Sequence, residues 1–244
     1  MARQPHLLVQ SGDLHDVVLL PGDPGRVDRI ADRCQDAETV AENREYKVVN
    51  AISEGTPITI CSTGIGCPSA AIALEELAAV GASTAIRVGT TGALQPDIDI
   101  GDLIVPTAAA KDEGTTRRYE SDTIPAVASV AVLSALLEAA TAEGRPVHTG
   151  PIVTDDAYYA ETEEYVAKWR EANLLSVEME AAAVFSLARR KGLRAGAICT
   201  VDGNLVRGTQ KGETEENEEL PVGARKAVDD AIDIALAAAR ALAE

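Results

Sequence analysis

The stretch STGIGCPSAAIALEEL, residues 62–77, decides the fold. It joins the end of an apolar run of strand length to apolar residues at helical spacing, and it carries Gly64 and Gly66 at the junction. Pro68 stands where the helix would begin, a position that suits its fixed φ angle and missing N–H. Glycine-bearing turns between a strand and a helix are typical of α/β proteins, which use them to bring backbone N–H groups close to a ligand.

The same alternation of strand and helix continues on both sides of this stretch. Apolar runs of strand length are predicted to be strands at 17–20, 45–52, 56–62, 83–89, 101–109, 145–154, 174–179 and 194–203. Helical spacing predicts helices within 22–33, 68–80, 127–144, 162–172, 181–191 and 222–242. We therefore expect one α/β domain over residues 1–244, with a central mixed β-sheet flanked by helices.

One segment departs from this alternation. Residues 204–220 are polar, rich in Glu and Gly, and without periodicity, which predicts a mobile surface loop. A solvated run of charge would explain the composition, but a loop just after a strand end is also well placed to close over a site.

Composition limits the classes of partner. The chain has 244 residues and a formal net charge of −17, which predicts no nucleic-acid partner and no anionic membrane surface. Because no apolar stretch approaches the length of a membrane helix or a signal peptide core, we expect a cytoplasmic protein. The acidity, with few lysines, favours a halophilic protein over an ordinary acidic enzyme. The four cysteines show no metal-ligand spacing, so no metal is expected.

Arginines accompany the glycine turns. Arg26 follows the turn at Gly22, and Arg87 ends an apolar run just before Gly89. Arg44 stands between two further predicted elements. A buried arginine needs a carboxylate of the protein or a bound anion, and each arginine alone would suit an internal salt bridge. Together with the glycine turns, the three favour a phosphate or carboxylate site.

Two acids interrupt an apolar run at Glu178 and Glu180. Residues two apart lie about 200° apart around a helix, so the two carboxylates could not share a helical face. In extended chain both side chains point to one side. We therefore expect extended backbone through Met179 and a helix that begins near Ala181.

Five segments together resemble the motifs of the nucleoside phosphorylase family, which includes uridine phosphorylase and the hexameric purine nucleoside phosphorylases. They are PGDPGRV (21–27), NREYKVV (43–49), STGIGCPSAAIALEEL (62–77), RVGTTGALQPDIDIGD (87–102) and SVEMEAAAV (176–184). The resemblance implies reversible phosphorolysis, in which a nucleoside and phosphate give the free base and ribose 1-phosphate. It also implies inorganic phosphate as co-substrate, no metal or organic cofactor, and a homo-oligomer of shared-site dimers, usually assembled as a hexamer.

The resemblance also assigns roles residue by residue. Phosphate ligands would be Gly22, Arg26, Arg87 and Thr90, with Arg44 from a neighbouring subunit, and Arg87 would also be catalytic. Ribose contacts would be Glu180 to the 2′- and 3′-hydroxyls, Met179 against the sugar, Glu178 nearby, and His6 across the interface to the 5′-hydroxyl. Three arginines around phosphate argue against a nucleosidase, which uses water.

Four further positions bear on the choice of base. Tyr158 is predicted to stack on the base. Where uridine phosphorylases carry a glutamine and an arginine, this chain has Thr162 and Glu164. Asp202 suits the acid that donates a proton to N7 of a purine, although an aspartate before a glycine is also an ordinary turn residue. We expect cleavage of purine ribonucleosides, with uridine as the alternative substrate.

Overall fold

The computed structural model describes residues 3–209 and 222–243. Its strands form one mixed sheet in the order β10-β6-β8-β9-β5-β1-β4-β3-β2, with β7 paired to β6. The strands are β1 Val17–Pro21, β2 Gln35–Asn43, β3 Tyr46–Ser53, β4 Thr56–Cys61, β5 Thr84–Ala93, β6 Leu103–Asp112, β7 Ala126–Val127, β8 Val147–Asp155, β9 Ser176–Glu178 and β10 Arg194–Asn204. Of the predicted mobile loop 204–220, residues 210–220 lie outside the described ranges.

The middle of the sheet closes on itself. Strand β10 pairs with both β5 and β6, and β9 pairs with both β8 and β5. Strand β1 lies parallel to β5 on the other side, and β5 is parallel to β10. The carboxyl ends of β1, β5 and β10 therefore meet at one edge, where open α/β sheets place their ligands.

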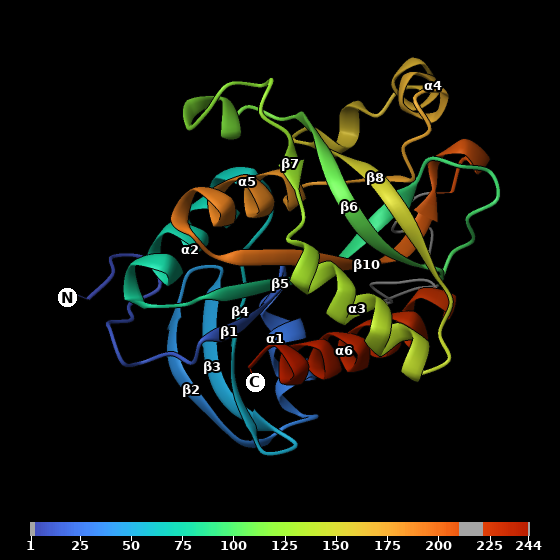
Figure 1. The fold of residues 1–244 in the computed structure, drawn as a ribbon. Coiled ribbons are helices and arrows are strands. Elements are labelled where there is room, and N and C mark those ends of the chain that lie inside the picture. Colours follow the sequence, from blue (N-terminus) through green and yellow to red (C-terminus); the bar gives the residue numbers. More distant parts are fainter. Residues whose placement is uncertain (1–2, 210–221, 244) are drawn as a thin grey trace.

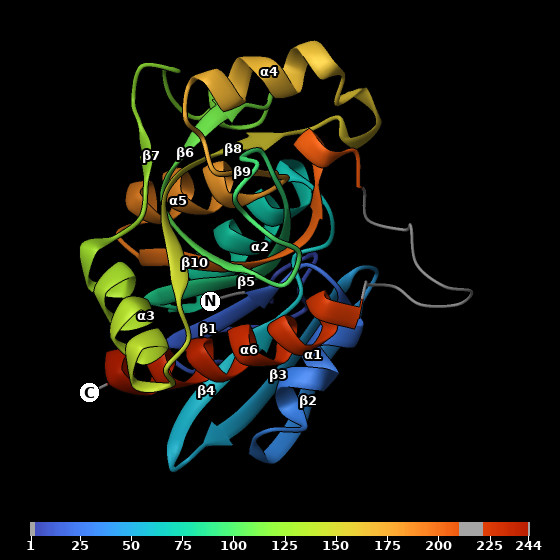
Figure 2. The ribbon, with the colours of Figure 1, turned by 90° about the vertical axis from the view of Figure 1, so that its right-hand side faces the viewer.

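Helices cover both faces of the sheet (Figures 1 and 2). Helices α2 and α5 lie on one face, and α1, α3 and α6 lie on the other. The helices are α1 Pro24–Ala31, α2 Cys67–Val80, α3 Val130–Ala142, α4 Glu163–Glu171, α5 Ala181–Lys191 and α6 Val222–Ala243, with short 3₁₀ turns η1 Thr116–Arg118, η2 Tyr158–Ala160 and η3 Leu205–Arg207. Within the described residues, no helix combines the length and apolar character needed to cross a membrane.

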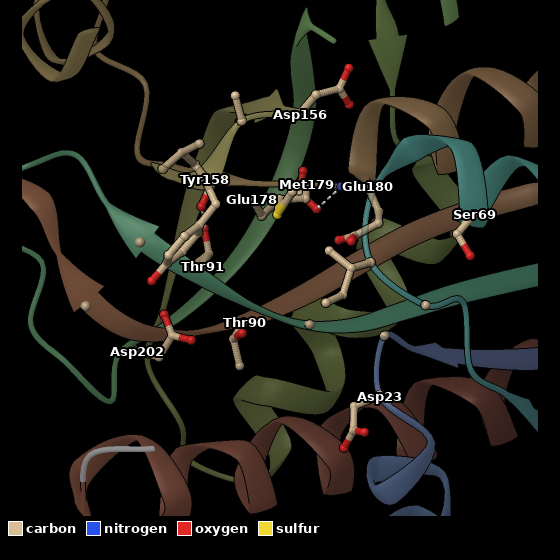
Figure 3. Close-up of a pocket in the computed structure, with 18 of the residues that line it drawn as sticks. Asp23, Ser69, Thr90, Thr91, Asp156, Tyr158, Glu178, Met179, Glu180 and Asp202 are labelled. Atoms are coloured by element: carbon tan, nitrogen blue, oxygen red, sulfur yellow. Dashed lines mark hydrogen bonds between the residues drawn. The ribbon is translucent and has the colours of Figure 1, made fainter. Parts of the chain in front are cut away.

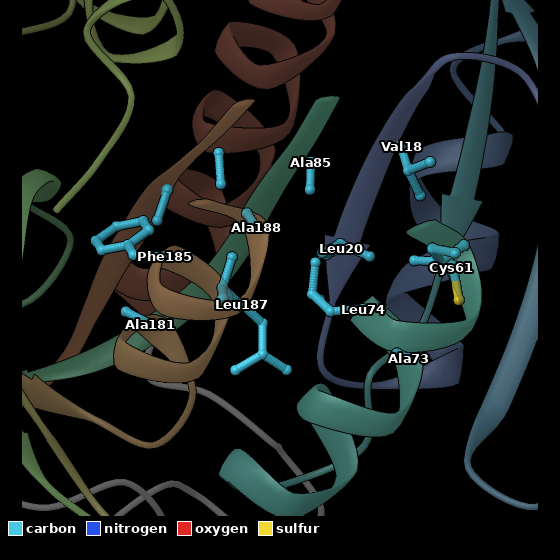
Figure 4. Packing of buried hydrophobic residues seen from close by; sticks show 14 of the residues in the cluster. Val18, Leu20, Cys61, Ala73, Leu74, Ala85, Ala181, Phe185, Leu187 and Ala188 are labelled. Atoms are coloured by element: carbon cyan, nitrogen blue, oxygen red, sulfur yellow. The ribbon is translucent and has the colours of Figure 1, made fainter. Parts of the chain in front are cut away.

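Small aliphatic side chains fill the core, because only 3% of the residues are aromatic. Leu74 of α2 lies beside Leu20 of β1, and Val18 of β1 and Phe185 and Leu187 of α5 belong to the same buried cluster (Figure 4). All five side chains are buried, so this layer holds α2, which follows the turn at Gly64 and Gly66, and α5, which follows Glu178 and Glu180, against the sheet.

The predicted architecture is confirmed: one α/β domain with a mixed sheet flanked by helices. The helix predicted at 181–191 is α5, with the same bounds. Strand β2 was not predicted, because its residues Gln35–Asn43 are mostly polar and exposed and carry no buried alternation. These residues form a strand because they pair antiparallel with β3 at the edge of the sheet.

Candidate active site

A cavity of about 1100 Å³ opens at the carboxyl ends of β1, β5 and β10. The turn after β4, the β9–α5 junction and the η2 segment close its sides. Figure 3 shows Asp23 at one end, Met179 and Glu180 in the middle, and Tyr158 with Asp202 at the other end. One cavity thus collects residues from segments far apart in the sequence.

Four of the expected phosphate ligands meet at one end of the cavity: Gly22, Arg26, Arg87 and Thr90. The side chain of Asp23 caps α1 by accepting from the backbone N–H of Arg26 at 3.1 Å, which sets the start of the helix that carries this arginine. Arg26 Nη1 donates to the carbonyl of Val88 at 3.2 Å, so the guanidinium lies across β5. Burial, and then the charge of Arg87, lower the pKa of Arg26.

Arg87 is held by two carboxylates of the chain itself. Its Nε donates to Glu178 Oε2 at 2.9 Å, and its Nη2 pairs with Glu180. Burial acts to lower the pKa of Arg87, but the charges of Glu180 and Glu178 outweigh it and raise that pKa. The internal salt bridge considered for Arg87 is therefore present. Gly89 makes room for it, because a Cβ there would lie 2.9 Å from the Arg87 Cζ.

Both carboxylate oxygens of Glu178 accept hydrogen bonds from groups of the protein. Besides Arg87, it accepts from Thr154 Oγ1 at 2.6 Å and from the backbone N–H groups of Glu180 and Ala181, each at 2.9 Å. It thus caps the first turn of α5 and fixes the guanidinium at the same time. These contacts position Arg87 and the start of α5.

Glu180 faces the glycine turn. Its Oε1 accepts from the backbone N–H of Gly66 at 2.6 Å. Strand β9 ends at Glu178, one residue before the expected end of the extended backbone at Met179, and Glu180 with φ −140° and ψ −22° is not extended. Helix α5 begins at the next residue, and both Glu178 and Glu180 reach Arg87. The prediction that the two acids point to one side and precede a helix is confirmed.

The third part of the cavity is aromatic and acidic. Tyr158 lines it beside Asp202, and the charge of Asp202 adds to burial in raising the pKa of Tyr158. Thr162 caps α4 by accepting from the N–H of Tyr165 at 3.2 Å, and Glu164 is exposed on α4. Neither Thr162 nor Glu164 lines the cavity.

Sequence reasoning missed Glu161, which lies in the cavity wall between η2 and α4. Burial, and then the charges of Asp155 and Asp202, raise its pKa to about 7. No motif marks this position, because it is one of several acids in a polar loop. Only the path of the chain from β8 to α4 places it on the inner side.

Two expected ligands lie away from the cavity of their own chain. The buried carboxylate of Glu76 accepts from the backbone N–H of Leu7 at 2.7 Å and contacts His6 Nδ1 at 2.6 Å. His6 is therefore held against α2. Arg44 is exposed, in a tight turn with φ of 58°. Both residues are presented outward from the chain.

One group of side chains has the spacing of a metal site. Ligand atoms of Cys67, Glu113 and Asp156 lie within 4.8 Å of one another. Burial, and then the charge of Glu113, raise the pKa of the Cys67 thiol, which keeps it protonated. Glu113 already accepts from Thr115 N at 2.6 Å and from Thr116 N at 3.0 Å. Both donors that hold Glu113 belong to the segment that enters η1, so its carboxylate stabilises that turn.

The sheet, its helices and the cavity at the carboxyl ends of the strands have the fold of the nucleoside phosphorylases, as the superposition with a purine nucleoside phosphorylase shows. Residues 16–240 match the family model described as the Phosphorylase superfamily, and the chain belongs to this family. Its enzyme class is pentosyltransferase, as the motifs predicted.

Three relatives show how far the likeness extends. The chain is 62% identical to a guanosine phosphorylase of Halorubrum lacusprofundi over 99% of this chain and 100% of the relative. It is 44% identical to a uridine phosphorylase of Thermococcus kodakarensis over 83% of this chain and 78% of the relative. The crystal structure of a Toxoplasma gondii purine nucleoside phosphorylase in complex with immucillin-H superposes with a TM-score of 0.92 at 31% identity, covering 100% of this chain and 97% of the other.

Proposed function

We propose that the protein catalyses reversible phosphorolysis of purine ribonucleosides, with guanosine as the preferred substrate. One observation carries the proposal: Asp202 lines the cavity beside Tyr158, in the same cavity as Arg26 and Arg87. A proton donor and a phosphate site would then flank a sugar between them. The 62% identity to a guanosine phosphorylase supports the choice of base.

The proposed reaction follows from these positions. Phosphate on Arg26, Arg87 and Thr90 attacks C1′ of the ribose while the bond from C1′ to N9 breaks. The electron pair of that bond goes to the purine, and Asp202 donates a proton to N7, which offsets the negative charge that develops on the base. The carboxylate of Glu180 accepts from the ribose hydroxyls, and Met179 packs on the sugar, so the two reacting atoms are held in line.

The charge of the cavity supports a shared site. Two arginines line it, against seven acidic residues: Asp23, Glu45, Asp156, Glu161, Glu178, Glu180 and Asp202. Arg87 already lies between two of these carboxylates. A doubly charged phosphate in such surroundings needs a further cation. We propose that Arg44 of a neighbouring subunit supplies it, with His6 reaching the 5′-hydroxyl from the same side, in a homo-oligomer of shared-site dimers assembled as a hexamer.

Location and working conditions belong to the same proposal. Four free cysteines suit a reducing cytoplasm, where salvage of nucleosides would take place. The net charge of −17 suits concentrated salt, in which the repulsion between surface carboxylates is screened.

A substrate panel tests the reaction. Release of free base from guanosine, inosine, adenosine and uridine would be measured in concentrated salt, with and without inorganic phosphate. We expect cleavage that requires phosphate and is fastest with the purines. Cleavage of uridine far faster than every purine would overturn the role of Asp202, and cleavage without phosphate would point to a nucleosidase.

Complementation between subunits tests the shared site. Arg44→Ala and Asp202→Asn would each be inactive alone. In a mixed dimer, one site combines the intact Asp202 of one subunit with the intact Arg44 of the other, so co-expression should restore activity. If mixing restores none, Arg44 does not act across the interface.

A further inference from the structure

Glu161 occupies a defined place at the base end of the cavity. It follows the 3₁₀ turn η2 directly and precedes Thr162, the residue that caps α4. Its backbone is therefore held by a helix end on each side. The side chain is partly buried in the cavity wall, where Asp202 is one of the charges that act on it.

The base end of the cavity carries only negative or neutral groups among the described lining residues. Asp156, Glu161 and Asp202 are its charged side chains, and Tyr158 is its aromatic wall. The two arginines of the cavity belong to the phosphate end, where Arg26 lies across β5 at Val88. An edge of a base that presents carbonyl oxygens to these carboxylates would be repelled, whereas an edge that presents N–H groups would be bound.

We propose that Glu161 is the residue that selects guanine, by accepting hydrogen bonds from N1–H and from the 2-amino group at the same time. This inference rests on the proposed function, since it assigns the base edge within the same site. A carboxylate offers two oxygens side by side and suits two parallel N–H donors. Asp202 then serves the N7 side of the purine, and Glu161 serves the opposite edge.

The other bases match this carboxylate less well. Hypoxanthine keeps N1–H but lacks the 2-amino donor. Adenine has an acceptor at N1, and uracil places a carbonyl oxygen on either side of N3–H. Each therefore leaves one carboxylate oxygen without its donor or sets it against another acceptor, which costs binding energy in a partly buried site. Guanine is the base that satisfies both oxygens of Glu161.

The raised pKa of Glu161 supports this arrangement. Burial, and then Asp155 and Asp202, bring it to about 7, so the unbound site holds a carboxyl that two N–H donors would help to ionise. A solvated loop acid would not be shifted in this direction. The position of Glu161 in the cavity wall and its raised pKa both indicate a partly enclosed carboxyl group that can accept hydrogen bonds from a ligand.

The test compares guanosine and inosine, which differ only in the 2-amino group. For the wild type we expect kcat/KM for guanosine to exceed that for inosine by about 10- to 100-fold, the worth of one hydrogen bond to a charged group. Glu161→Gln should lower the guanosine value by a similar factor and leave inosine nearly unchanged, because an amide can still accept from N1–H and donate to O6. Glu163→Gln, which removes an exposed charge two residues away, is the matched control and should change neither.

The outcomes separate the two proposals. A wild type that cleaves no nucleoside with phosphate refutes the proposed function, whatever Glu161 does. An active wild type whose ratio of guanosine to inosine is near one, or a Glu161→Gln enzyme that keeps the wild-type ratio, overturns the role of Glu161. If Glu161→Gln fails to fold, the wild-type ratio and calorimetric binding of guanine against hypoxanthine still decide.

Discussion

Replacing Glu178 with glutamine should destabilise the fold strongly, because its carboxylate joins the phosphate end of the cavity to helix α5. The side chain is 1% exposed, so water cannot replace lost partners. Glutamine keeps the shape, but its NH₂ group replaces one carboxylate oxygen. At Oε2 it would face Arg87 Nε and the N–H of Ala181, each at 2.9 Å, and at Oε1 it would face Thr154 Oγ1 at 2.6 Å and the N–H of Ala181 at 3.0 Å. Breaking a buried ion pair costs ~3–5 kcal/mol. Because Arg87 keeps Glu180, we expect about 3 kcal/mol, or ~6–12 °C in Tm.

Urea denaturation of wild type and variant at one protein concentration measures this loss, since a change in oligomer content would also shift the midpoint. The exposed Glu163→Gln serves as control and should stay within about 0.5 kcal/mol of wild type. The loss should persist in concentrated NaCl, because salt screens a buried pair poorly. A loss below about 1 kcal/mol, or one that disappears in salt, would refute the reasoning.

Four further outcomes are expected. Asp202→Asn should lower kcat for purine nucleosides by ~10²–10⁴-fold with phosphate binding nearly intact; unchanged kcat would reject the acid role. Gly89→Ala sets a Cβ 2.9 Å from the Arg87 Cζ, so KM for phosphate should rise and stability should fall by about 1–3 kcal/mol. The pKa of Glu161 is raised from 4.5 to about 7 by burial, Asp155 and Asp202, so the folded state keeps a proton that the unfolded chain has lost. As pH rises through that interval, the urea midpoint of wild type should therefore fall relative to Glu161→Gln, and parallel midpoints would contradict the shift. With a net charge of −17, Tm should rise with NaCl; a flat Tm would argue against halophilic character.

The sequence alone was sufficient for the order and type of nearly every element. Periodicity and helix-start signals are local properties, and they located α5 with its correct bounds and the strand that precedes it to within one residue of its end. Strand β2 was not predicted from the sequence, because an exposed edge strand with polar residues is stabilised as a strand only by pairing with β3. The glycine turns and their arginines were also readable, since short motifs bring Gly22, Arg26 and Thr90 to the ends of predicted strands.

The tertiary structure alone decided how the charged groups pair and which of them face the cavity. Arg87 could have met any of many acids, and it meets Glu178 and Glu180 because β5 and the β9–α5 junction pack side by side. Glu161 turns inward while Thr162 caps a helix and Glu164 faces solvent, although the three are near neighbours in one polar segment. Local sequence determines which elements form, but the direction of a loop side chain depends on how distant elements pack around it.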